Sequence, residues 1–491
     1  MQRLNWCKRF GTLLVCCAAV AVVLPAQTLT TLESFDGTNG AYPLSGPLVQ
    51  GFNGSLYGTT LLGGSSENGT VFTIGRSNAF TSLTSSLDGS QPYSGLVLAS
   101  SGEFYGTTYF GGPHGAGQVF KMSAAGTAST LYGFCPQEDC PDGENPVGGL
   151  VVASNGDLYG TATFGGANGS GTVFKLTPSG TFTRLYSFCT QANCADGSQP
   201  EGGLMQATNG RIYGTTYGAG TGQGGTVFEI TPAGALSTVH EFCSLANCAD
   251  GGNPIGGLIQ GTDGNLYGTT QFGGTLPSGE GGTGTIYKIN PATGSLTTLY
   301  VFCSQPYCTD GESPFGALVE GTDGNFYGTT WGGGAANAGG FYSLTAGTVF
   351  QLTPDGVLTT LYSFCTQTGC PDGSNPEGAL AQSTNGNFYG TTCGGDCIGT
   401  SGDGTVFELS MGLHPFVRTV PIAGEVGEQV RILGTNLTGA TSVTFNGTAA
   451  VFTVTASTLI TATVPSGATT GRVKVVIPQG TLTSNTAFQV E

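Results

Sequence analysis

Seven copies of the tetrapeptide Tyr-Gly-Thr-Thr, spaced at nearly regular intervals, constrain the fold of this chain more than any other feature. Consecutive tyrosines are 48 to 62 residues apart, and in the third copy Ala162 replaces the last threonine. Each copy precedes a glycine-rich loop and a Gly-Thr-Val-Phe segment or a close variant. A period of this length is typical of solenoids and propellers. The tyrosines are Tyr57, Tyr105, Tyr159, Tyr213, Tyr267, Tyr327 and Tyr389.

The third repeat shows the internal pattern of one unit most clearly. Four short apolar segments, at residues 148–152, 157–163, 172–176 and 182–188, are separated by Gly, Pro and Asn turns, with no helical period between them. This pattern predicts a four-stranded antiparallel sheet. Because adjacent residues along the strands are apolar, both faces of the sheet need cover. Neighbouring blades of a ring provide that cover, so the sequence predicts a seven-bladed β-propeller.

The ring closes if the first strand of the chain completes the last blade. The seventh unit ends after its third strand, residues 405–409, whereas an unpaired fourth-strand pattern stands at residues 28–35. Pairing of the two removes an exposed sheet edge. It also predicts that the closing strand is outermost and that the Gly-Gly-Leu strand of each unit lines the axis.

The remaining segments define two further regions of an all-β chain. Residues 1–26 combine a basic start with an apolar core and predict a signal peptide, and residues 27–411 form the predicted propeller. Residues 412–491 change to short alternating strands and predict an immunoglobulin-like β-sandwich. The signal predicts a secreted, periplasmic or cell-surface protein. We also expect a monomer with no membrane span in the mature chain.

Two known families resemble these motifs. The ordered series Asp-Gly-x-x-Pro, Gly-Gly-Leu, Leu-Tyr-Gly-Thr-Thr, Gly-Thr-Val-Phe and Leu-Tyr-x-Phe, over residues 28–409, resembles the GloVer tandem-repeat family of exported bacterial proteins. Residues 415–491 resemble an IPT/TIG immunoglobulin-like domain. The first resemblance implies no established activity, and the second implies a binding or accessory module at cell surfaces without catalytic residues. The IPT/TIG pattern is carried by Gly427, Val430, Ile432, Gly434, Asn436, residues 443–447, Val464 and Pro465.

Twelve cysteines beyond residue 26 occur as six local pairs. Five pairs have the spacing Cys-x4-Cys after the fourth strand of a unit, and the sixth lies in the last glycine-rich loop. In an exported chain this pattern predicts disulfides, whereas a metal site would need two pairs to converge or nearby histidines. The predicted bridges join Cys135 to Cys140, Cys189 to Cys194, Cys243 to Cys248, Cys303 to Cys308, Cys365 to Cys370 and Cys393 to Cys397.

Other polar features restrict the possible chemistry. Seven Asp-Gly pairs before the axial strands predict turns, and the alternative is a ring of calcium ligands. No cofactor, no metal site and no catalytic residue is predicted, since the sequence shows no Ser/His/acid set and no paired carboxylates. A formal net charge of −17 with no basic patch argues against a nucleic-acid partner.

The variable loops carry the functional prediction. Loops after the second and fourth strands of each unit emerge on one face, which bears the disulfide loops and glycine-rich loops with isolated aromatic residues. The predicted ligand-binding residues are His114, Trp331, Phe341 and Tyr342. The sequence thus predicts an exported, non-catalytic binding or surface-interaction protein that recognises a glycan or a partner protein. The alternatives are a polysaccharide lyase or hydrolase on a propeller scaffold and a structural envelope repeat protein.

Overall fold

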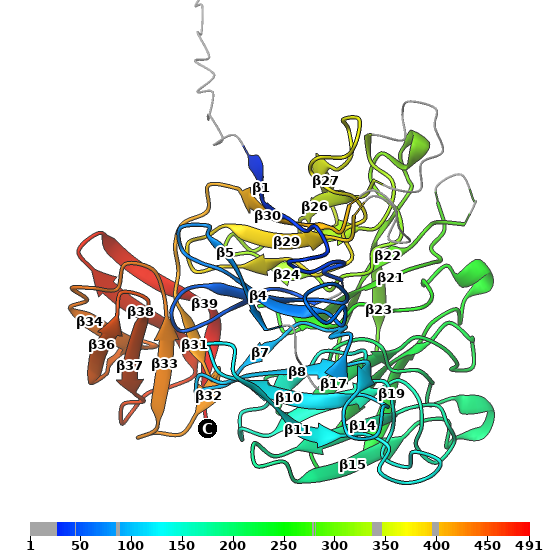
Figure 1. Ribbon diagram of the computed structural model, residues 1–491, viewed down its shortest axis with the longest axis horizontal. Coiled ribbons are helices and arrows are strands. Elements are labelled where there is room, and N and C mark those ends of the chain that lie inside the picture. The colour runs from blue at the N-terminus through cyan, green and yellow to red at the C-terminus, as the bar shows by residue number, and fades with distance from the viewer. Residues whose placement is uncertain are drawn as a thin grey trace, which may run out of the picture.

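The computed structural model describes residues 27–44, 46–84, 89–276, 279, 281–335, 346–394 and 402–491. Within them the chain forms seven four-stranded antiparallel sheets, followed by a carboxyl-terminal β-sandwich (Figure 1). The predicted all-β class and the predicted seven-bladed propeller are confirmed. No helix among these residues is long and apolar enough to cross a membrane.

In the first six blades the strands follow the order of the chain from the axis to the rim, and in the seventh the outermost strand comes from the amino end of the described chain. The first four blades are β2 (Val49–Gln50), β3 (Leu56–Thr60), β4 (Thr70–Ile74), β5 (Phe80–Thr84); β7 (Val97–Leu98), β8 (Phe104–Thr108), β10 (Gln118–Met122), β11 (Ala128–Gly133); β12 (Val151–Val152), β13 (Leu158–Ala162), β14 (Thr172–Leu176), β15 (Phe182–Ser187); and β16 (Met205–Gln206), β17 (Ile212–Thr216), β18 (Thr226–Ile230), β19 (Leu236–Glu241).

The last three blades are β20 (Ile259–Gln260), β21 (Leu266–Thr270), β22 (Thr285–Ile289), β23 (Leu296–Val301); β24 (Val319–Glu320), β25 (Phe326–Thr330), β26 (Thr348–Leu352), β27 (Leu358–Ser363); and β28 (Ala381–Gln382), β29 (Phe388–Thr392), β30 (Thr405–Ser410), β1 (Thr28–Ser34). The loops add a short pair, β6 (Gly89–Ser90) with β9 (Phe110–Gly111), and three 3-10 turns, η1 (Ala192–Cys194), η2 (Ala246–Cys248) and η3 (Pro306–Cys308).

The closing strand lies where the sequence predicts it. β1 pairs antiparallel with β30, with Thr28 opposite Ser410 and Ser34 opposite Thr405. The amino end of the described chain therefore forms the rim of the seventh blade, and the two-residue strand β28 lies at the axis.

Each residue of the repeated tetrapeptide has a structural role, as the first blade shows. Tyr57 is buried against Phe104 of the next blade, with ring centroids 4.3 Å apart. A Cβ on Gly58 would lie 2.5 Å from the ring of Phe72, so only glycine fits there. Thr59 donates a hydrogen bond of 3.0 Å to the carbonyl of Ser94 in the next blade, and the hydroxyls of Thr60 and Thr70 are hydrogen-bonded within the blade.

The axis also requires glycine, because neighbouring inner strands approach one another closely there. A Cβ added to Gly46 would lie 1.8 Å from the backbone nitrogen of Gly95 in the next blade. The equivalent Gly256 would place a Cβ 3.0 Å from the carbonyls of Phe315 and Gly316. This contact explains the glycine at this position in six of the seven units, the exception being Ser94 in the second.

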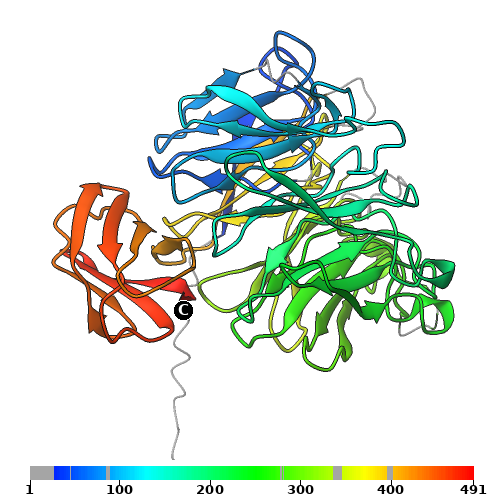
Figure 2. The same ribbon diagram turned by 90° about the horizontal axis from the view of Figure 1, so that it is seen from below.

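The carboxyl-terminal domain is a sandwich of two sheets around one apolar core (Figure 2). The boundary at residues 411 and 412 stays a prediction, although the last propeller strand ends at Ser410. The four-stranded sheet is β31 (Arg418–Val420), β33 (Gln429–Leu433), β37 (Leu459–Thr463), β36 (Phe452–Ala456), and the five-stranded sheet is β32 (Ala423–Gly424), β39 (Gly480–Val490), β38 (Gly471–Ile477), β34 (Ser442–Phe445), β35 (Thr448–Ala449).

This domain packs on the propeller face that carries the short turns between first and second strands. At five blade boundaries a side chain from an inner strand accepts a hydrogen bond from the preceding turn, as Gln260 Oε1 does from the Thr208 amide at 2.9 Å. Between the first and second blades Phe52 and Leu98 stand at these positions. Leu433 of the sandwich joins their apolar cluster. The domain therefore docks where apolar residues replace the hydrogen bond that joins neighbouring blades at five other boundaries.

Candidate functional site at the axis of the propeller

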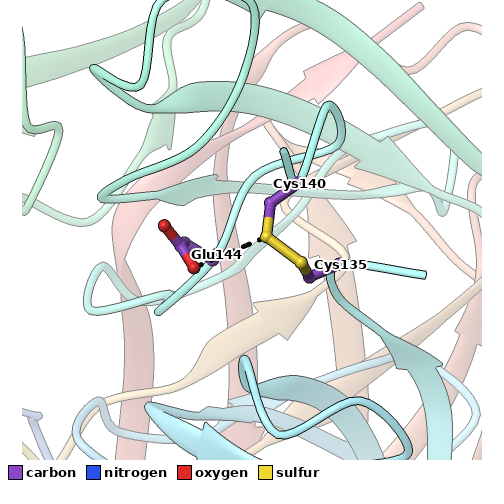
Figure 3. A group of neighbouring side chains, drawn as sticks. All are labelled: Cys135, Cys140 and Glu144. Atoms are coloured by element: carbon purple, nitrogen blue, oxygen red, sulfur yellow. Dashed lines mark hydrogen bonds between the residues drawn. A yellow bond between two sulfur atoms is a disulfide. The ribbon is translucent and has the colours of Figure 1, made fainter. Parts of the chain in front are cut away.

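Five disulfides stiffen the loops on the opposite face. The predicted Cys-x4-Cys pairs are all bonded, with Cα atoms 3.9 to 4.2 Å apart. Figure 3 shows the pair Cys135–Cys140 with Glu144 beside it, Oε2 lying 3.5 Å from Cys140 Sγ. Sulfurs that are bonded to each other offer no thiolate to a metal ion, so the disulfide interpretation of these pairs is confirmed. For the sixth pair, Cys397 lies outside the described residues.

The Asp-Gly pairs hold the disulfide loops in place. Asp196 accepts a hydrogen bond from the hydroxyl of Tyr186 at 2.8 Å and another from the backbone amide of Thr190 at 3.0 Å. The same tyrosine-to-aspartate bond recurs in three other blades, and Gly197 takes a φ of 94° after the aspartate. These carboxylates therefore engage their own loop, as the turn interpretation predicts.

His240 occupies the tyrosine position of this arrangement in the fourth blade. Its Nε2 lies 3.4 Å from Asp250 Oδ2, and the side chain is largely buried. Burial lowers the pKa of His240, and the nearby Asp250 opposes that shift only in part. The histidine is thus a variant of a repeated structural contact.

Two of the four predicted binding residues lie in the part of the chain that the structure describes, and both are in loops of this face. His114 is exposed in the glycine-rich loop of the second blade, and Trp331 is half-buried at the start of the corresponding loop in the sixth blade. Phe341 and Tyr342 lie outside the described residues. The two loop sets adjoin, since Glu144 of a disulfide loop forms a β-bridge with Phe164 of a glycine-rich loop.

A cavity of about 290 Å³ opens at the axis, between the inner strands. All seven blades line it, mostly through backbone and small residues of the segments between the repeated proline and the axial leucine. The residue after the proline varies among the blades, with glutamate in two of them, whereas the proline repeats in all seven. In chain order these residues are Leu44, Tyr93, Val147, Glu201, Ile255, Phe315 and Glu377, of which all but Leu44 line the cavity.

Two carboxyl groups therefore face one cavity. Burial raises the pKa of Glu201 to about 7. Burial also raises the pKa of Glu377 to about 7, although a hydrogen bond from Trp331 works against the shift. Both glutamates contribute to the raised pKa of Tyr93, after its own burial, which brings it to about 12.

A second tier of variable residues, those directly after Tyr-Gly-Thr-Thr, contacts residues of the cavity wall. In the second and sixth blades this residue packs beside the residue that follows the proline of the same blade. The ring centroids of Tyr93 and Tyr109 are 6.0 Å apart, and those of Phe315 and Trp331 are 6.2 Å apart. The negative charge of Glu201 raises the pKa of Tyr217, after the larger effect of burial. Of the two predicted binding residues that the structure describes, Trp331 lies next to the cavity, against Phe315, which lines it.

The sequence contains a signal for the residues that the analysis missed. The third to seventh units read Asp-Gly-x-x-Pro-x-Gly, and in them the residue after the proline is apolar, aromatic or acidic while the proline and the glycine repeat. The second unit has the aromatic Tyr93 there, followed by Ser94 in place of the glycine. The position of the variable residue at the axis follows from the positive φ of the residue before the proline, for example 53° at Asn145, which turns the chain inward. The position of these residues around one cavity depends on how the blades are arranged, which the local sequence does not show.

A second cavity, of about 650 Å³, lies on the opposite side of the propeller. It lies between the carboxyl-terminal domain and the inner strands and turns of the third to fifth blades, with Thr208, Thr262, Ile422 and Arg472 among its lining residues.

Comparisons with known proteins support the architecture. The model of the Gloeobacter/Verrucomicrobia repeat matches residues 19–141 and 137–342, and that of the IPT/TIG domain matches residues 415–490. A fungal alcohol oxidase solved with copper is similar at 13% identity and a TM-score of 0.50, covering 92% of this chain and 98% of that one. An oligogalacturonate lyase from Vibrio parahaemolyticus has 12% identity and a TM-score of 0.47, covering 78% and 93%. No curated protein matches the sequence. At these identities the likeness shows the fold alone.

Proposed function

The chain belongs to the Gloeobacter/Verrucomicrobia repeat family and carries an IPT/TIG domain, and from this premise we propose that it is an exported, non-catalytic binding protein that recognises a glycan at the axial cavity. The proposal of export rests on the signal-like residues 1–26. The proposed binding role rests on the variable residues that line the axial cavity. The face that bears the disulfide loops is the face that presents the ligand site.

The observation that carries this proposal is that variable residues from different blades meet at one cavity. Residues that repeat in every blade pack against neighbours or close turns. The residues after the repeated prolines, and the residues directly after Tyr-Gly-Thr-Thr, differ among the blades. Tyr93, Phe315 and Trp331 provide aromatic faces that stack on sugar rings. Glu201 and Glu377 provide carboxyl oxygens that accept hydrogen bonds from sugar hydroxyls.

A second candidate function is hydrolysis or elimination on a polysaccharide. It is favoured by the two carboxyl groups that share a cavity with pKa values of about 7, because general acids and bases work best near the pH of the reaction. A turnover screen in parallel with the binding assay separates this candidate from pure binding.

A glycan array with the purified mature protein, followed by calorimetry on the hits, tests the proposal. We expect Tyr93→Ala and Trp331→Ala to weaken binding at least about tenfold, roughly 1.4 kcal/mol each, with unchanged melting curves. Tyr307→Ala is the matched control, since Tyr307 lies in a disulfide loop of the same face and is 70% exposed. Loss of binding in Tyr307→Ala together with full binding in the two cavity variants would place the site on the loops instead.

A further inference from the structure

We propose that the ligand of the axial cavity carries a positively charged amino group, and that its chemical class is an amino sugar with a free, unacetylated nitrogen. The inference rests on the proposed glycan binding and narrows it. Three features of the cavity point to this ligand: two carboxyl groups without a basic partner, aromatic faces beside them, and a negative surrounding field.

The carboxyl groups lack a positive counterpart. The described residues that line the cavity include no lysine, arginine or histidine. Trp331 donates a hydrogen bond to Glu377, and no hydrogen bond or ion pair is found for the Glu201 side chain within the described part of the chain. A buried carboxylate without a partner is unfavourable, and an ammonium group bound in the cavity that both glutamates line would supply the missing positive charge.

The aromatic residues offer a second interaction with the same charge. Tyr93 and Phe315 line the cavity, and Tyr109 and Trp331 pack beside them. Aromatic faces attract organic cations, and cages of such residues recognise alkylated ammonium groups. A neutral sugar gains stacking from these rings, whereas a sugar that bears an ammonium group gains stacking and charge attraction.

The titratable side chains around Glu201 and Glu377 also favour a cationic ligand. The other titratable side chains near the pair are Tyr93, Tyr109, Tyr217 and, further out, Glu144, all of them neutral or negative. The chain as a whole has a formal net charge of −17. Anionic glycans are therefore repelled and cationic ones are drawn to the mouth.

Calorimetry with matched probes tests the charge requirement. Choline is compared with 3,3-dimethylbutan-1-ol, which has nearly the same shape without the charge, and a glucosamine oligomer is compared with the N-acetylglucosamine oligomer of equal length. We expect the charged member of each pair to bind at least about tenfold more tightly. Glu201→Gln and Glu377→Gln should each reduce choline affinity about tenfold, whereas the control Glu312→Gln, in a disulfide loop outside the cavity, should leave it unchanged.

A pH series with choline, whose charge does not titrate, adds a readout that a structural role would not move. Since burial raises both glutamate pKa values to about 7, the carboxylates are charged above that pH, and affinity should rise from about pH 5 to about pH 9. Equal binding of charged and neutral probes would overturn the inference while leaving glycan binding intact. Absence of binding by every glycan, charged or neutral, would overturn the proposed function as well.

Discussion

Glu201 and Glu377 are placed where they weaken the fold at neutral pH. Their folded pKa values are raised to about 7, so the folded chain holds protons there that the unfolded chain releases. The associated stability is present below the ordinary glutamate pKa and is lost as pH rises through about 7. We expect Glu201→Gln and Glu377→Gln each to raise the free energy of unfolding at about pH 8 by up to about 2 kcal/mol, and so to raise the melting temperature, and to leave both unchanged at about pH 4. Calorimetric melting curves at the two pH values check this, and a lower melting temperature at pH 8 would contradict it.

His240 should change the pH dependence of stability in the opposite direction to the two glutamates. Because burial lowers its pKa, the unfolded chain binds a proton more readily, and stability falls as pH drops below the ordinary histidine range. We expect His240→Tyr to restore the hydroxyl-to-aspartate bond of the other blades, with a gain of about 1 kcal/mol that increases toward low pH. Melting temperatures measured between about pH 5 and about pH 8 provide the readout. A constant difference across that range would show that His240 does not titrate with unfolding.

The site was only partly predictable at this scale. Trp331 was found because an aromatic residue in a loop is an evident candidate. Glu201 and Glu377 belong to motifs 176 positions apart in the chain, and their shared cavity depends on the ring that brings the fourth and seventh blades to one axis. A comparison of the repeats position by position would have singled them out, because they vary where their neighbours do not.

Among the elements, β1 has the largest predicted effect for its length. It covers the outer edge of β30, and its removal exposes that edge and the apolar residues beneath it. We expect deletion of residues 27–34 to lower the melting temperature strongly and to promote aggregation. A synthetic peptide of residues 27–35, added in excess, should restore part of the loss, whereas a scrambled peptide should not. An unchanged melting curve for the deletion would contradict the closure.

Most elements could be predicted because local and global signals agree. The second and third strands of each blade carry adjacent apolar residues and end at glycine turns, and the structure has them within one or two residues of the predicted bounds. The innermost strands contain only two residues each, shorter than the predicted 148–152 segment, because the close glycine contacts at the axis hold the remainder outside regular pairing. The short pair β6 and β9 had no sequence signal, since it depends on where two loops meet.

At the scale of the whole molecule, the carboxyl-terminal domain is a structural part of the propeller face on which it docks. Leu433 is fully buried in a cluster with Leu98 and Phe52, and Thr458 donates a hydrogen bond of 2.8 Å to the carbonyl of Phe52. We expect Leu433→Asp to lower the melting temperature and to split a single calorimetric transition into two, at a cost of about 3 kcal/mol or more. Val451→Asp is the control, because Val451 lies on the same domain and is 80% exposed. Two transitions in the unaltered protein would contradict this coupling.

The pairing of β1 with β30 also decides how the ring would respond to tension. Thr28 lies opposite Ser410, so the segments that enter and leave the propeller depart from the same end of one ladder. A pull applied through those two segments would peel the ladder open one hydrogen bond at a time instead of shearing all of them together. The first six blades would bear none of this load until the seventh had opened. A ring built this way resists heat through its closure, yet it would yield to a modest pull at a single seam.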